Sequence, residues 1–201
     1  MRFHKPAPMD PAQFDGLAGP DPWDVVEAAH RTAAIVVGRG RENEDPEVTA
    51  RLIELVPELG LATLAQLWAD RPARSLPGAL WRLYLLHEWV QRSPDEVARA
   101  YTAGAGHADV YRVIAGLSEP PSPQDLRELT QAILNGVFTG DLEVALERAA
   151  AFAHVMAVGL ADPAADVEDV PAEQVRRAAR VQTMARDLHV CAGLWSRGDL
   201  I

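Results

Sequence analysis

Four of the six histidines in this 201-residue sequence fall on the apolar sides of four different predicted helices. They are His30, His87, His154 and His189. Imidazole binds metal ions and exchanges protons near neutral pH, and the interiors of helical bundles are places where metal and haem sites are assembled. His154 is the only ionisable residue in the apolar stretch 149–161. If it is buried without a partner, desolvation lowers its pKa and leaves it neutral at pH 7.

One carboxylate has a spacing that suits a metal site. Glu27 precedes His30 by three residues, so the two side chains project together from a helix, as in carboxylate-bridged di-metal proteins. Such proteins need a second Glu-x-x-His pair, which the sequence lacks. One hypothesis is therefore a metal- or haem-dependent enzyme, with iron, zinc or haem held by Glu27, His30, His87, His154 and His189. The alternative interpretation is that each histidine is a half-buried structural residue, hydrogen-bonded to a carbonyl or an acid.

The dipeptide Ala29-His30 on the first predicted helix, together with the helical pattern, is similar to haem oxygenases and their thiaminase-like relatives. Haem oxygenases have a proximal histidine on the first helix, which implies haem as the cofactor. They also have a glycine-rich distal helix, and Gly136, Gly140 and Gly159 do not reproduce it. We assign no family on this similarity.

Two other patterns bear on binding or chemistry. An apolar ligand could lie between the helices predicted over 76–92 and 141–160, in a cavity lined by Trp81, Tyr84, Phe152 and Met156. The only cysteine, Cys191, lies two residues from His189. Residues two apart do not share a helix face, so a Cys–His nucleophile is not expected in this segment.

The elements that must position these residues are helices. Capping side chains precede proline at Asp21, Asp45, Ser93 and Ser122, and Glu96 follows Ser93 at the spacing of a capping box. Glycines that tolerate a left-handed cap suggest helix ends at 38, 60, 104, 136 and 159. Between these marks, apolar residues recur with the helical period. The predicted helices cover about 22–37, 46–56, 61–69, 76–92, 94–103, 107–116, 123–135, 141–160 and 171–195.

These helices predict an all-α, single-domain bundle of about eight to nine helices over residues 21–201, after a proline-rich N-terminal arm, 1–20. The helices over 76–92 and 141–160 are apolar on most sides and should be central. No segment alternates with the two-residue period of a half-buried strand.

Composition excludes several classes of protein. A net charge of −10 and a pI near 5.0 argue against a nucleic-acid-binding surface, and the longest apolar stretch, 149–161, is too short to span a bilayer. A single cysteine and an N-terminus without an apolar signal region favour a cytoplasmic location. Abundant alanine and one lysine, Lys5, against many arginines indicate a GC-rich bacterial genome.

The leading functional hypothesis is a non-catalytic interaction or regulatory protein. Standard catalytic motifs are missing from the sequence, whereas apolar, tryptophan-bearing helices exceed what one small core easily covers. We expect the partner to be a second copy of the chain or another protein, and we expect no cofactor.

Overall fold

The structure is a computed structural model that describes residues 21–42, 61–116, 122–162 and 172–201, and these residues form α-helices without a strand. The predicted all-α bundle is confirmed for the described residues. The helix predicted over 46–56 and the N-terminal arm 1–20 lie outside them. The eight described helices are α2 (Pro22–Glu42), α4 (Leu61–Trp68), α5 (Leu76–Arg92), α6 (Pro94–Ala105), α7 (Asp109–Ala115), α8 (Pro123–Phe138), α9 (Leu142–Ala161) and α10 (Ala172–Arg197).

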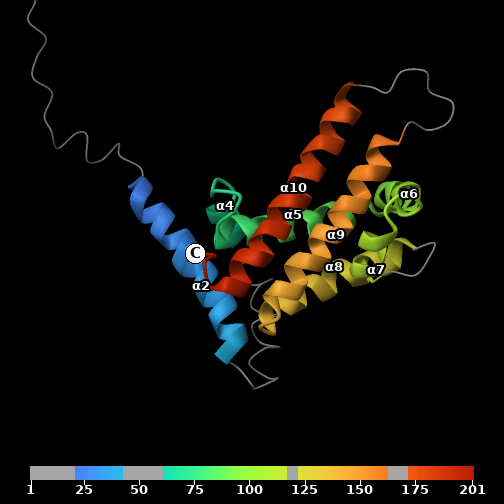
Figure 1. Ribbon diagram of the computed structural model, residues 1–201. Coiled ribbons are helices and arrows are strands. Elements are labelled where there is room, and N and C mark those ends of the chain that lie inside the picture. Colours follow the sequence, from blue (N-terminus) through green and yellow to red (C-terminus); the bar gives the residue numbers. More distant parts are fainter. Residues whose placement is uncertain (1–20, 43–60, 117–121, 163–171) are drawn as a thin grey trace, which may run out of the picture.

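Among the described helices, the most extensive contact is between α9 and α10, which lie side by side as an antiparallel pair (Figure 1). Figure 1 shows α6 and α7 beside α9, on the side away from α10, and α2 at the opposite edge of the molecule. Helix α2 packs on α4, α5 and α8. The end of α10 carries the C-terminus towards α2.

The two helices predicted to be central, α5 and α9, do occupy the centre of the bundle. Helix α9 packs against α5, α6, α7, α8 and α10, and α5 contacts every one of α2, α4, α6, α8, α9 and α10. By length and hydropathy α9 would also suit a membrane span. However, 67% of its most apolar 18-residue segment is buried inside the protein. Its all-round apolar surface is therefore accounted for by packing on five neighbouring helices.

Side-chain caps define several helix starts. Asp21 accepts a hydrogen bond from the Trp23 amide, and Ser122 forms a full capping box with Asp125, so both predicted caps are confirmed. The capping box predicted at Ser93 is wrong, because its side chain makes no capping bond and Glu96 instead pairs with Arg177 of α10. An ion pair that joins two helices has replaced a local cap.

The helix end predicted at Gly38 is wrong, because α2 continues to Glu42, and Gly60 lies outside the described residues. Helices α6, α8 and α9 do end within two residues of Gly104, Gly136 and Gly159, but none of these glycines has the left-handed conformation predicted for a cap. For two of these glycines the structure gives the reason. A Cβ on Gly159 would lie 1.7 Å from the carbonyl oxygen of Ala100, and one on Gly104 would lie 2.0 Å from that of Val155. Glycine is needed there because the backbones of α6 and α9 touch, and not because of a left-handed cap.

The last helix is tied to the start of α5 by a buried acid. Asp187 is buried and pairs with Arg74 at 3.1 Å and with Arg82 at 3.9 Å. The Leu76 amide donates to the carbonyl oxygen of Ile201 at 2.9 Å. These bonds hold α10 against α5, and they fix the rotation of α10 about its axis.

The contact between α6 and α9 leads to a stability prediction. Gly159→Ala should lower the free energy of unfolding by about 2 kcal/mol or more, because the helices must separate to admit the methyl group. Gly193→Ala in α10 is the matched control, since the nearest atom to its added Cβ is the end of the flexible Arg197 side chain at 3.4 Å. It should be neutral or stabilising by up to about 1 kcal/mol.

The free energy of unfolding of each variant is measured by urea unfolding, followed by circular dichroism. Equal free energies of unfolding for the two would contradict a backbone contact at Gly159.

Candidate functional site

Three of the five residues predicted to hold a metal lie outside the pocket that the other two share. Glu27 and His30 are on α2, where the exposed Glu27 carboxylate pairs with Arg31. His87 is on α5, and its Nδ1 atom is buried without a hydrogen-bond partner among the described residues. Burial lowers the pKa of His87, against a smaller opposing effect of Glu88. Within the described ranges, no three His, Cys, Asp or Glu side chains form a group that could hold a metal ion.

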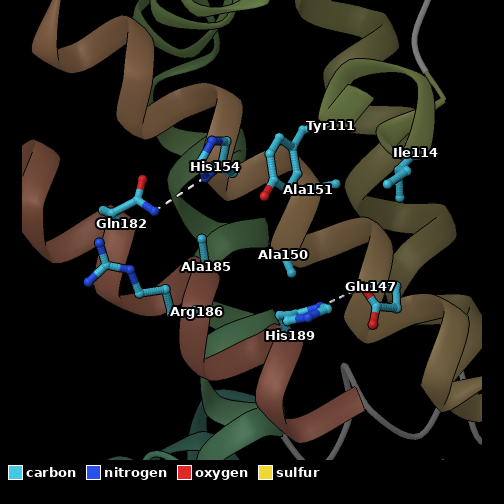
Figure 2. Close-up of a pocket in the computed structure, with 10 residues that line it drawn as sticks. All are labelled: Tyr111, Ile114, Glu147, Ala150, Ala151, His154, Gln182, Ala185, Arg186 and His189. Carbon is cyan, nitrogen blue, oxygen red and sulfur yellow. Dashed lines mark hydrogen bonds and ion pairs between the residues drawn. The ribbon is translucent and has the colours of Figure 1, made fainter. Parts of the chain in front are cut away.

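The other two predicted residues, His154 and His189, line one pocket between α7, α9 and α10 (Figure 2). Its volume is about 240 Å³. Helices α9 and α10 each contribute residues at i, i+3, i+4 and i+7, which lie along one helix face. The lining residues are Tyr111 and Ile114 from α7; Glu147, Ala150, Ala151 and His154 from α9; and Gln182, Ala185, Arg186 and His189 from α10.

His154 is held at one end of the pocket by residues from two other helices. The Tyr111 ring stacks on the imidazole with a centroid distance of 3.9 Å, and Gln182 Nε2 donates to His154 Nδ1 at 3.2 Å. A neutral ring that accepts at Nδ1 carries its proton on Nε2. Burial lowers the pKa of His154, and the positive charge of Arg186 lowers it further. His154 is therefore a neutral hydrogen-bond donor at pH 7.

His189 occupies the other end of the pocket (Figure 2). Its Nδ1 lies 3.0 Å from Glu147 Oε2, and the side chain is exposed. The antiparallel packing of α9 and α10 places Glu147, two turns before His154 on α9, opposite His189. An imidazole that donates from Nδ1 to a carboxylate leaves Nε2 free to accept a proton or a hydrogen bond.

Three of the four residues predicted to line an apolar ligand cavity belong to two separate ring stacks. Trp81 stacks on Tyr84 within α5, whereas Phe152 stacks on Tyr101 of α6, each pair with centroids 5.6 Å apart. Phe152 and Met156 are fully buried in the core. Tyr84 lines a cavity of about 20 Å³, which is the volume of a single water molecule and not of an organic ligand.

Cys191 is buried, and its thiol lies 3.6 Å from the carbonyl oxygen of Ala73. Burial raises its pKa to about 11. Since the thiolate is the reactive form, burial disfavours a nucleophilic role for this cysteine.

A surface that the sequence did not reveal lies on α7. Four of the seven residues in this short helix are large, apolar and exposed, and they define what we name the α7 surface: Val110, Tyr111, Val113 and Ile114. The outermost two, Val110 and Val113, are 70% and 74% exposed. Helical periodicity detects an apolar face equally well whether it meets the core or solvent, so sequence alone gave no signal of this exposure.

Comparison of the chain with family models, with curated proteins and with solved structures found no match. The features of this chain that bear on function are therefore the pocket and the α7 surface.

The electrostatics of the pocket give a prediction for His154. Arg186→Gln should raise the pKa of His154, because the variant removes the positive charge that opposes protonation of the ring. The control is Arg180→Gln, which removes the same charge six residues earlier on α10, at a residue that pairs with Glu173. NMR titration of the imidazole protons measures the His154 pKa in both variants. An unchanged pKa in Arg186→Gln would contradict the position of Arg186 close to His154.

The same pKa shift has a consequence for stability. The folded state holds the His154 pKa below the unfolded value of 6.5, so the unfolded chain binds more protons as the solution becomes acidic. The contribution of His154 to the free energy of unfolding is complete above pH 6.5 and is lost as the pH falls through the folded pKa. His154→Gln should flatten this part of the curve of unfolding free energy against pH, measured by urea unfolding at several pH values. An unaltered slope would show that His154 titrates identically in the folded and unfolded states.

Proposed function

We propose that this protein is a helical interaction module and that the α7 surface is its contact face. The observation that carries the proposal is the exposure of Val110, Tyr111, Val113 and Ile114 on one seven-residue helix. Contiguous exposed apolar side chains on a soluble domain mark contact sites, whereas single ones are ordinary. Fully burying a valine or isoleucine side chain contributes about 1.5 kcal/mol or more, so a partner that covered this helix would gain several times that amount.

Helix α7 packs against α9, and these contacts hold it in place. Ala115 is fully buried, and its carbonyl oxygen accepts a hydrogen bond from Arg148 of α9 at 3.4 Å. Tyr111 of α7 is held by its stack on His154, which is also on α9. Since α7 is anchored on α9 at both positions, its outer valines can meet a partner without a rearrangement of the core.

The partner that we propose is a second copy of the chain. Elsewhere on the described surface, the exposed large apolar side chains are scattered over separate elements: Trp23, Leu85, Val144, Val175 and Ile201. A head-to-tail assembly needs two different complementary patches, whereas a two-fold dimer needs one patch that meets itself. One apolar cluster in the described residues therefore favours a closed dimer, in which α7 packs against α7 of the partner.

The prediction is a change in oligomeric state. The wild-type chain should elute with twice its chain mass of 21.8 kDa in size-exclusion chromatography with light scattering, and should dissociate on dilution. Val113→Asp should elute as a monomer, because a charge placed in the contact would be desolvated without a partner.

Val175→Asp is the matched control, since Val175 is an exposed valine on α10, outside the α7 surface. It should remain a dimer. A monomeric wild-type chain at millimolar concentration, or equal dissociation of the two variants, would overturn the proposed contact.

A further inference from the structure

The pocket between α7, α9 and α10 contains polar groups that an α7 contact does not use. Its floor is made of three buried alanines, Ala150, Ala151 and Ala185, and Ile114 extends the apolar wall. Figure 2 shows Ala150 and Ala185 between the two ends of the pocket, with His154 at one end and His189 at the other. Small floor residues leave a space of about 240 Å³ where larger side chains would have filled the groove.

Of the two charged groups that line the pocket, Glu147 has a side-chain partner and Arg186 has no ion-pair partner among the described residues. The Glu147 carboxylate is engaged by His189 at 3.0 Å. Arg186, in contrast, makes no ion pair in the part of the chain that the structure describes, although its charge is close enough to lower the pKa of His154. The pocket therefore has a positive charge and an imidazole N–H donor at the His154 end, whereas its carboxylate, Glu147, lies at the His189 end.

We propose that this pocket binds a small organic carboxylate, with its apolar body on the alanine floor and its carboxylate facing Arg186 and His154. A guanidinium is the side chain best suited to a carboxylate, because its N–H donors match the two oxygens. The His154 Nε2–H is a second donor, since Nδ1 is occupied by Gln182.

The volume of the pocket limits the size of the ligand. At about 30 Å³ for each water molecule in the liquid, 240 Å³ corresponds to about eight waters, or an organic molecule of about ten non-hydrogen atoms. Benzoate is of this size. Its ring would lie against Ala150 and Ala185, beside the Tyr111 ring, which makes it a suitable probe for the class.

A bound carboxylate should also change the titration of His154. The groups that face this imidazole are Tyr111 from α7 and Gln182 and Arg186 from α10, whereas Glu147 and His189 lie at the far end of the pocket. An anion between Arg186 and His154 favours the protonated imidazole. Benzoate should therefore raise the His154 pKa, whereas the neutral analogue benzyl alcohol should leave it unchanged.

The experiment is an NMR titration of the full chain with benzoate and, separately, with benzyl alcohol. Benzoate should shift the resonances of Ala150, Ala185 and His154. Arg186→Gln should weaken its binding about tenfold, the effect of losing one charge-assisted hydrogen bond. Arg180→Gln, with the same loss of charge outside the pocket, should bind benzoate as the wild-type chain does.

Three results would overturn the proposal: no benzoate shifts at tens of millimolar, equal binding of benzyl alcohol, or equal weakening by the two arginine variants. Both arginines are exposed, so neither variant should impair folding. The Val113→Asp variant should still bind benzoate, which separates this pocket from the proposed dimer contact.

Discussion

The backbone contact between α6 and α9 is the constraint on which the rest of the structure depends. Gly104 and Gly159 let the two helices approach until a Cβ at either position would overlap a carbonyl group of the other helix. The glycines fix where α9 lies along α6, and α9 in turn supports α5, α7, α8 and α10. A shift at this crossing would move the face of α9 that carries His154, five residues before Gly159.

The small side chains of α9 also determine the shape of its outer face. Ala150 and Ala151 allow α7 and α10 to lie close to the helix, yet they do not fill the groove between them. Leucine at either position would fill this space, as Leu146 does in the core one turn earlier. Small residues thus serve two purposes on one helix, close backbone packing at Gly159 and an open pocket at the alanines.

The helices could be predicted because they depend on interactions between near neighbours in the sequence. The site could not be predicted, because it depends on how α9 and α10 are aligned in the folded chain. Capping at Asp21 and Ser122 and the helical period placed the described elements well, since both depend on near neighbours. The left-handed caps predicted at Gly104 and Gly159 are wrong because the sequence does not show which glycines face a second backbone. His154 and His189 were identified as candidates, but their partners Gln182 and Glu147 follow from the antiparallel register of α9 and α10, which no local pattern contains. Glu27 and His30 had a suggestive spacing, yet Glu27 pairs with Arg31 on its own helix.

Tyr111 links the α7 surface to the pocket, and this gives the two proposed contacts a physical connection. One face of its ring stacks on His154 inside the pocket, while the residue also belongs to the exposed side of α7. The stack already holds this ring in place, so a partner seated on the outer valines of α7 does not have to reorder the side of Tyr111 that faces the pocket. A charge at Val113 can therefore disrupt the outer contact and leave the pocket intact.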